Sequence, residues 1–302
     1  MALLGQALPV AAVALAAPAV RAGPTPITKP IPVSGERLPV IGMGTWLTFD
    51  VGDDAAALAS RQAVLQAFFA AGGSMIDSSP MYGSAETVLG RLLRALPRRA
   101  WAGQLFSATK VWTIGRGAGD GQMRRSLRRW GLERFDLMQV HNLLDWRAHL
   151  PTMRLWREQG LIRTIGVTTS HGWRHAELEA VLRAERLDFV QFTYSIGHRA
   201  AERRLLPLAR DLGIAVIANR PFDGGALFDR VRGRDLPPWA AEFDCGSWAQ
   251  FFLKFIVSHP AVSCAIPATR RLDHMRDNMG ANFGRLPDAA QRAMMARLFE
   301  AL

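Results

Sequence analysis

The chain has 302 residues, enough for one large α/β domain or for two domains of ordinary size. Hydrophobic residues make up 49% of it and charged residues 21%, a composition that excludes a disordered protein. The formal net charge is +11, and of the 37 basic residues all except three are arginines, scattered along the chain. No zinc-finger, helix-turn-helix or RNA-binding signature accompanies them, so we expect no nucleic-acid partner.

The first 26 residues differ in composition from the rest of the chain. They are largely apolar and alanine-rich, and Val20-Arg21-Ala22 approximates the small-x-Ala pattern of a signal-peptidase site. Gln6, Pro9 and Pro18 interrupt the apolar stretch, which argues against a spanning helix and against stable membrane insertion after processing. We predict a signal-peptide-like or disordered segment over residues 1–26 and an exported, periplasmic protein. The alternative is a disordered extension on a cytoplasmic enzyme.

From about residue 27 the chain alternates between short β-rich runs and amphipathic segments. Residues 31–33 and 38–40 flank a glycine turn and predict a short hairpin. The runs that follow predict eight strands, at residues 40–44, 74–77, 105–109, 136–140, 164–168, 189–192, 214–218 and 263–266. They are short and apolar, as expected when both faces of a parallel sheet are buried.

Helices fill the gaps between these strands. Asp53 or Asp54 can cap a helix that ends at Gly72-Gly73. Leucines at helical spacing predict another helix over residues 202–212, and Ser247 can cap a third that carries several phenylalanines.

Eight strands separated by helices predict a (β/α)₈ TIM barrel with an N-terminal β-hairpin, a single domain over residues 27–302. The rival is a doubly wound open sheet, which usually carries a glycine-rich phosphate loop after its first strand. Residues 42–46 do not form a GxGxxG motif, and the chain has no Walker sequence. Cys245 and Cys264 lie in no Cys-x-x-Cys pair and no cluster with histidines, so we expect no metal site.

Four polar residues fall where predicted strands end, the face on which barrel enzymes carry their chemistry. Asp77, Lys110 and His141 end the second, third and fourth strands, and Tyr82 follows Asp77 by five residues. Taken singly, each has a structural explanation: a helix cap, a surface charge or a core histidine. Taken together they are stronger evidence for a catalytic site. The chain has only three lysines and two tyrosines, so abundance does not explain one of each at neighbouring strand ends.

These four side chains suit proton donation to an oxygen that gains negative charge. A phenol is a poor acid at neutral pH, but an ammonium group beside it favours the phenolate and lowers its pKa. A carboxylate paired with the ammonium keeps the lysine charged, and an imidazole opposite can orient a substrate oxygen. A carbonyl oxygen becomes such an acceptor as a hydride reaches its carbon.

The sequence resembles the aldo/keto reductase family from about Pro30 to Asn278. The most specific segment runs from Asp77 to Gly90 and resembles the family signature Asp-x-x-x-x-Tyr-Gly-x-x-Glu-x-x-x-Gly. Thr109-Lys110-Val111-Trp112 and Gln139-Val140-His141-Asn142 resemble the segments of the family lysine and histidine. The resemblance implies Tyr82 as general acid, Lys110 and Asp77 as the residues that tune it, and His141 as the substrate orienter, with no metal.

The resemblance also implies NADP(H) bound in extended form across the barrel mouth, with NAD(H) as the alternative. Several positions depart from the family pattern: Thr169 stands for an asparagine, Asn219 for the stacking tyrosine, Ala268 for a lysine and His274 for an arginine. The cofactor-binding residues implied are Gly44, Thr45, Trp46, Thr168, Thr169, Gln191, Asn219, Arg220, Thr269, Arg270, His274, Asp277 and Asn278.

Apolar residues near strand ends suggest a small carbonyl substrate with an apolar or aromatic body. The predicted pocket residues are Trp46, Met81, Trp112, Trp146 and Phe222. We expect a monomeric NADP(H)-dependent reductase of an aldehyde or ketone. The altered cofactor positions leave two alternatives: a nicotinamide-binding regulatory subunit with little turnover, and a cofactor-free barrel that binds a sugar or peptide.

Overall fold

The structure is a computed structural model that describes residues 25–302. The predicted signal-like segment lies almost entirely outside these residues, so its extent and the start of the barrel domain stay predictions. Among the described residues, no helix is both long enough and apolar enough to cross a membrane.

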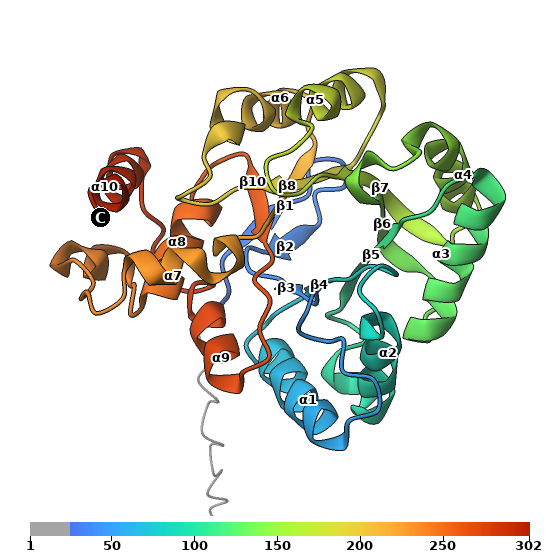
Figure 1. Ribbon diagram of the computed structural model, residues 1–302, viewed down its shortest axis with the longest axis horizontal. Coiled ribbons are helices and arrows are strands. Elements are labelled where there is room, and N and C mark those ends of the chain that lie inside the picture. The colour runs from blue at the N-terminus through green and yellow to red at the C-terminus, as the bar shows by residue number, and fades with distance from the viewer. Residues whose placement is uncertain (1–24) are drawn as a thin grey trace, which may run out of the picture.

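Eight parallel strands form the centre of the molecule, in the order β3 to β10 along the chain (Figure 1). Each pairs in parallel with its neighbour in sequence. The predicted barrel is confirmed. The strands are β3 (Met43–Gly44), β4 (Met75–Asp77), β5 (Phe106–Val111), β6 (Phe135–Val140), β7 (Ile162–Thr168), β8 (Phe189–Thr193), β9 (Ala215–Asn219) and β10 (Val262–Ala265).

The barrel closes between its first and last strands. Isolated parallel bridges join Ile41 to Ala265 and Gly44 to Ala268. Only Met43–Gly44 of the predicted first strand pairs with β4, because the chain before it turns to β10 instead. Gly42 allows the chain to pass close to β4 at this point, since a Cβ on Gly42 would lie 2.9 Å from the carbonyl oxygen of Met75.

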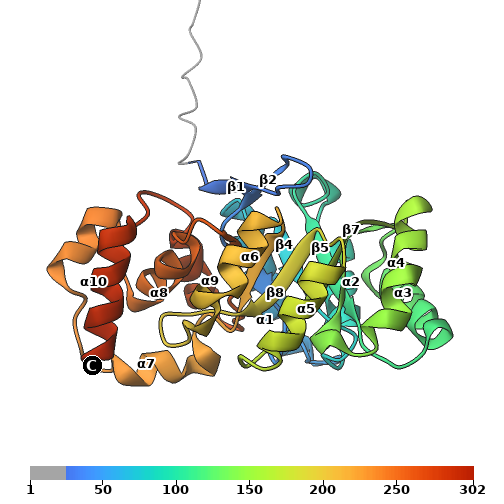
Figure 2. The same ribbon diagram turned by 90° about the horizontal axis from the view of Figure 1, so that it is seen from above.

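The N-terminal hairpin covers one end of the barrel. Strands β1 (Thr28–Pro30) and β2 (Arg37–Pro39) pair antiparallel, and Figure 2 shows them at the end of the barrel opposite α7. The first strand lies three residues earlier than predicted, because Ile31 already belongs to the turn and donates its N–H to the Glu36 carbonyl. Ile31 and Leu38 are fully buried against the residues that fill the barrel interior. The opposite end is therefore the open one.

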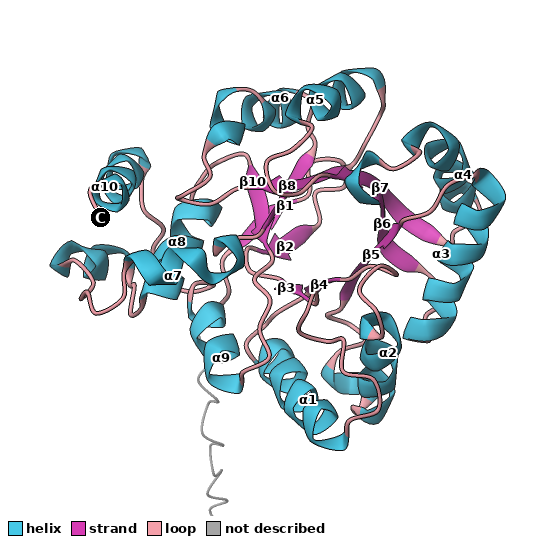
Figure 3. Cartoon of the chain, in the orientation of Figure 1, coloured by secondary structure: helices cyan, strands magenta, loops and turns pink. Residues whose placement is uncertain are grey.

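Helices surround the strands (Figure 3) and their apolar faces pack on the barrel to form the larger of two hydrophobic clusters. As predicted, Asp54 caps the first helix through the Ala57 N–H and Ser247 caps the eighth through that of Gln250. The helices are α1 (Ala55–Ala70), α2 (Ala85–Ala95), α3 (Arg116–Trp130), α4 (Trp146–Glu158), α5 (His175–Ala184), α6 (Leu205–Asp211), α7 (Ala226–Arg230), α8 (Trp248–Val257), α9 (Leu272–Gly280) and α10 (Ala289–Glu300).

The predicted helix over residues 202–212 divides into two pieces. A 3₁₀ turn, Ala200–Arg203, precedes α6. Arg204 between them has backbone angles outside the helical region, so the leucine spacing continues while the helix does not.

Candidate active site

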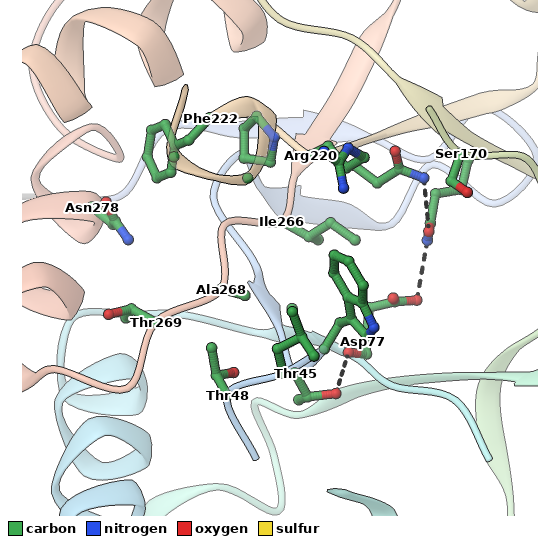
Figure 4. A pocket seen from close by; sticks show the side chains of 18 of the residues that line it. Thr45, Thr48, Asp77, Ser170, Arg220, Phe222, Ile266, Ala268, Thr269 and Asn278 are labelled. Atoms are coloured by element: carbon green, nitrogen blue, oxygen red, sulfur yellow. Dashed lines mark hydrogen bonds between the residues drawn. The ribbon is translucent and has the colours of Figure 1, made fainter. Parts of the chain in front are cut away.

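A cavity of about 940 Å³ opens at the carboxyl ends of the barrel strands. The residues that line it come from the ends of β3, β4, β7 and β9 and the loops after them, from the loop after β6, from Gln191 within β8, and from the segment that follows β10. Figure 4 shows the cavity with Asp77 and Thr45 at one side and Thr269 and Asn278 at the other. The four predicted catalytic residues meet at the Asp77 side.

Lys110 and Asp77 form a buried ion pair beneath this side of the cavity. The Lys110 Nζ lies 2.5 Å from Asp77 Oδ2 and 2.8 Å from the Ser78 carbonyl oxygen, and both side chains are almost completely buried. Burial by itself lowers the pKa of Lys110, but Asp77 and Tyr82 together outweigh it and the net pKa is raised. The lysine therefore stays charged at every physiological pH.

The Tyr82 ring lies between Lys110 and His141. The Lys110 Nζ is 5.2 Å from the centre of the ring, and the His141 ring meets it edge-on with centres 5.7 Å apart. Burial raises the pKa of Tyr82, and the opposing effect of Lys110 is smaller, so the net pKa is raised. This net direction is opposite to the sequence expectation, which considered the ammonium and not the burial. The phenol holds its proton until an acceptor arrives.

His141 is a neutral imidazole in this environment. Burial first, and then the charge of Lys110, lower its pKa well below the usual range. Its Nδ1 lies 3.0 Å from the hydroxyl oxygen of Ser79, which also accepts the Met81 N–H. If the Ser79 hydroxyl donates to Nδ1, the ring proton resides on Nε2, where it can be donated to a ligand.

A row of buried amides supports Asp77 from the far side of the barrel. The Nε2 atoms of Gln139 and Gln191 donate to Asp77 Oδ1 at 2.9 and 3.1 Å, and Gln191 also donates to Gln139 Oε1. The carboxylate thus has three side-chain donors, Lys110 included, and its orientation is determined by three strands. Gln139 was not among the predicted site residues. Its signal in the sequence is that a polar residue stands in an apolar strand, two positions before His141.

Asn219 belongs to the same row and also lines the cavity, but its amide is held by hydrogen bonds inside the protein. Its Nδ2 donates to the Thr169 carbonyl oxygen at 2.9 Å and to Gln191 Oε1 at 3.3 Å, and its Oδ1 accepts from the Thr193 hydroxyl at 2.8 Å. All its hydrogen-bonding groups are therefore used inside the protein. Arg220 and Phe222, which follow it in the chain, line the cavity as well.

Three polar atoms in the cavity wall are buried and lack a hydrogen-bond partner: Thr48 Oγ1, Thr169 Oγ1 and Arg220 Nε. Buried polar groups without a partner are rare and need an explanation. A polar ligand that contacts several loops, as an extended dinucleotide would, supplies such partners. The donors and acceptors present therefore fit a nicotinamide cofactor.

The segment after β10 supplies the other end of the cavity. Thr269, His274 and Asn278 line it, as does Asp277, whose Oδ1 accepts from Ser247 and Gln250 at 2.8 Å each. Arg270 is exposed and does not belong to the lining. The remaining predicted cofactor positions, Gly44, Thr45, Trp46, Thr168, Thr169 and Gln191, all line the cavity.

The predicted substrate residues divide into two groups. Trp46, Met81 and Phe222 line the cavity, whereas Trp112 and Trp146 lie outside the lining. Aromatic residues that the sequence reasoning did not name also line it, namely His171, Trp173, Phe228 and Trp248. The available signal for Trp173 was its position shortly after the predicted strand 164–168, the kind of position from which the other pocket aromatics were predicted.

Backbone strain in the described residues concentrates around this cavity. Nine residues other than glycine have positive φ, and eight of them lie in loops that follow barrel strands. Such conformations cost about 1–3 kcal/mol each and persist at functional sites, where the surrounding structure imposes them. The eight are Leu47, Asn142, Leu143, Asp145, His171, Arg174, Arg220 and Asp223.

The family is decided by a sequence comparison. The model of the aldo/keto reductase family matches residues 40–296, most of the chain. The chain belongs to the aldo/keto reductase family. In this aldo/keto reductase, Tyr82 and His141 lie beside the buried pair of Asp77 and Lys110.

The relatives found are reductases. The chain is 28% identical over 279 residues to the methylglyoxal reductase YeaE of Escherichia coli, covering 90% of this chain and 95% of that protein. It is 28% identical over 249 residues to the NADH-specific methylglyoxal reductase of the same species, covering 70% and 72%. A Klebsiella pneumoniae aldo/keto reductase solved in complex with NADP and acetate has a TM-score of 0.71 at 24% identity, covering 88% and 93%.

Proposed function

We propose that this aldo/keto reductase reduces a small aldehyde or ketone by hydride transfer from NADP(H), with Tyr82 as the proton donor. One observation carries the proposal: Tyr82 lies against the charged Lys110 and the neutral His141 at one side of a cavity large enough for a dinucleotide. The resemblance to the family signature assigns the same roles to the same residues.

The cofactor would be held by the cavity wall at both ends. Thr168, Thr169 and Gln191 would hold the nicotinamide amide, and Thr269, His274 and Asn278 the adenosine. The nicotinamide would supply the hydride. NADP(H) is favoured over NAD(H) because the Thr269 hydroxyl and His274 can both contact a phosphate. Ala268 and the NADH-specific relative keep NAD(H) as the alternative.

The chain's own residues divide the remaining chemistry among them. His141 would donate a hydrogen bond to the carbonyl oxygen and hold it near Tyr82. The Tyr82 hydroxyl would then give its proton to that oxygen, and the positive charge of Lys110 would stabilise the phenolate that remains. Asp77 keeps Lys110 charged and in place. The wall of aromatic side chains would exclude water from the reacting atoms.

Replacement of Tyr82 by phenylalanine tests the proposal. Y82F removes the proton donor and keeps the ring, so turnover of an aromatic aldehyde should fall on the order of 100- to 10,000-fold, the usual contribution of a general acid. Binding of NADPH, measured by fluorescence titration, should be unchanged. Undiminished turnover in Y82F would refute the assignment of Tyr82.

A nicotinamide-binding regulatory subunit is the second candidate, and Asn219 favours it. The amide is engaged inside the protein, so this position offers no ring to hold a nicotinamide for reaction. This candidate predicts tight NADPH binding with negligible turnover across a panel of aldehydes. A titration in which NADPH causes no fluorescence change would instead favour the cofactor-free barrel.

We also propose that the protein is exported and that it is a monomer. The alanine-rich segment before residue 27 and its small-x-Ala site support export. N-terminal sequencing of the protein from its host would show whether the segment is removed. Light scattering of the purified chain would report the oligomeric state.

A further inference from the structure

A single arginine side chain enters the cavity at its catalytic end. Arg220 follows β9 directly and its side chain is 18% exposed. In Figure 4 it lies on the same side of the cavity as Ser170, whereas Thr269 and Asn278 lie at the opposite side. Its guanidinium is 5.9 Å from the ring centre of Trp46. A group bound to Arg220 is therefore close to the side of the cavity that holds Tyr82.

The hydrogen bonding of Arg220 is incomplete. Its Nε is buried and has no partner. Its ion pair is a single contact, 3.3 Å from one terminal nitrogen to Oδ1 of Asp223, a carboxylate that is 40% exposed. A guanidinium has five N–H donors, and burying one of them without a partner is energetically unfavourable, more so because the group is charged. An acceptor in the cavity would remove that cost.

The surroundings leave the charge of Arg220 uncompensated toward the cavity. Lys110 is neutralised by Asp77. Burial, and then the charge of Arg220, lower the pKa of His171, so that this ring is neutral. The guanidinium lies 5.9 Å from the ring centre of Trp46, which supplies an apolar face and no counter-charge. Among the described residues that line the cavity near Tyr82, Arg220 is the one cation, and its only carboxylate partner, Asp223, is held by a single contact and does not line the cavity.

The backbone holds Arg220 in this position at an energetic cost. Its φ is +50°, in the left-handed region that residues other than glycine avoid, and Asp223 in the same turn has a φ of +48°. The turn therefore holds a charged side chain in the cavity wall by means of a backbone conformation that is itself unfavourable.

We propose that Arg220 binds an oxyanion of the substrate, so that the preferred carbonyl compound carries a carboxylate. The proposal rests on the proposed function, because it names the substrate class of the same site. A carboxylate would accept a charge-assisted hydrogen bond from the unpartnered Nε–H, and Trp46 would contact the apolar body between the carboxylate and the carbonyl. The phosphates of a cofactor are the competing occupant, and the experiment separates the two.

The test compares two aldehydes that differ in one charge, 4-carboxybenzaldehyde and its methyl ester. The wild-type protein should show a higher kcat/KM for the acid. In Arg220→Gln, kcat/KM for the acid should fall about 10- to 100-fold further than that for the ester, which is the loss of one charge-assisted hydrogen bond. Arg220→Lys, which keeps the charge and loses the Nε–H, should recover part of the preference. Arg210→Gln removes an exposed charge from α6 and should leave the ratio unaltered.

A cofactor role for Arg220 would give a different result. R220Q would then weaken NADPH binding in a fluorescence titration and lower kcat/KM for both aldehydes equally, which overturns the proposal. A wild-type preference for the ester would overturn it as well.

Failure of the proposed function would be seen separately, as a wild-type protein that turns over neither aldehyde. Binding then decides the matter. The carboxylate 4-(hydroxymethyl)benzoate should quench the tryptophan fluorescence of the wild type saturably, through Trp46, and R220Q should lose this quenching. Absence of saturable quenching in the wild type would overturn the inference without reference to catalysis.

Discussion

At the scale of single residues, Ser79 determines where His141 carries its proton. The Ser79 hydroxyl is completely buried, accepts the Met81 N–H and lies 3.0 Å from His141 Nδ1. With one N–H already directed at its oxygen, the hydroxyl hydrogen is free to point at the imidazole. We infer that Ser79 is a positioning residue that keeps the His141 proton on Nε2, the ring nitrogen that it does not contact.

Replacement of Ser79 by alanine should disturb this arrangement without removing any group that contacts substrate. We expect kcat to fall roughly 5- to 30-fold, equivalent to one buried hydrogen bond of about 1–2 kcal/mol. Nitrogen NMR of histidine-labelled protein should show His141 shifting from one tautomer to a mixture. A fall in kcat with an unchanged His141 spectrum would contradict the positioning role.

The lowered pKa of His141 predicts the acid side of the pH profile. Because the folded-state pKa lies well below the usual 6.5, the ring stays neutral as the pH falls through that value. Turnover should therefore not decline near pH 6.5 on account of His141, and a decline should appear only at more acidic pH. A pH–rate profile that halves near 6.5 in the wild type and not in His141→Gln would contradict this.

At the scale of elements, the signature residues Glu86 and Gly90 join α2 to its neighbours. The Glu86 carboxylate is fully buried and accepts from the hydroxyls of Thr109 on β5 and Ser126 on α3 at 2.7 and 2.9 Å. One turn later, a Cβ on Gly90 would lie 1.9 Å from the carbonyl oxygen of Arg129. The two residues thus determine how closely α2 and α3 approach, and through α2 the position of the loop that carries Tyr82.

Alanine at Gly90 should therefore separate the two helices. We expect G90A to lower the free energy of unfolding by about 2–3 kcal/mol, as overpacking a well-filled interface does, despite the better helix propensity of alanine. Gly121 in the middle of α3 is a matched control, since a Cβ there meets only the flexible end of Arg125 at 3.4 Å. G121A should stabilise the protein by about 0.5–1 kcal/mol. Urea denaturation of both variants decides the point, and equal effects would contradict it.

At the scale of the whole molecule, all three lysines are used inside the protein and the surface cations are arginines. Lys110 serves the active site. The three N–H groups of the Lys254 ammonium are shared among four backbone carbonyls within hydrogen-bond distance, those of Phe243, Asp244, Phe283 and Arg285. Lys254 therefore joins α8 to the segments before and after it. Lys29 attaches the N-terminal hairpin to the start of β10, through the carbonyls of His259 before the strand and of Val262, its first residue.

Lys29 makes the attachment of the hairpin dependent on pH. Burial, and then the charge of Arg292, lower its pKa from 10.5 to about 8. Between these two values the unfolded chain binds a proton that the folded chain has released, so the stability contributed by this group rises with pH. The wild type should gain about 1–3 kcal/mol over Lys29→Met between about pH 7.5 and about pH 10 in chemical denaturation. A constant difference between the two proteins would contradict this.

Local patterns predicted much of the fold and the candidate site. The eight strands, the helix caps at Asp54 and Ser247 and the four polar residues at strand ends depend on periodicity and on neighbours a few positions away, which a sequence displays directly. Asp77, Lys110 and His141 could be placed together because parallel strands in a barrel present their carboxyl ends on one face.

Side-chain direction and burial could not be read in the same way. Trp112 and Trp146 follow strand ends as Trp46 does, yet they lie outside the cavity lining. Three left-handed residues, Asn142, Leu143 and Asp145, redirect the chain before Trp146, and no local pattern marks them. The row of amides from Gln139 to Asn219 likewise depends on which side chains four strands turn inward.

The sequence by itself determined the barrel, its open end and the four polar residues that meet at one side of the cavity, because these follow from periodicity and from a short motif. Only the tertiary structure decided the protonation of Tyr82 and His141 and the exposure of Arg220 to the cavity. The burial and the electrostatic environment of these side chains depend on residues that are distant in the chain. Those residues become neighbours only when the chain has folded.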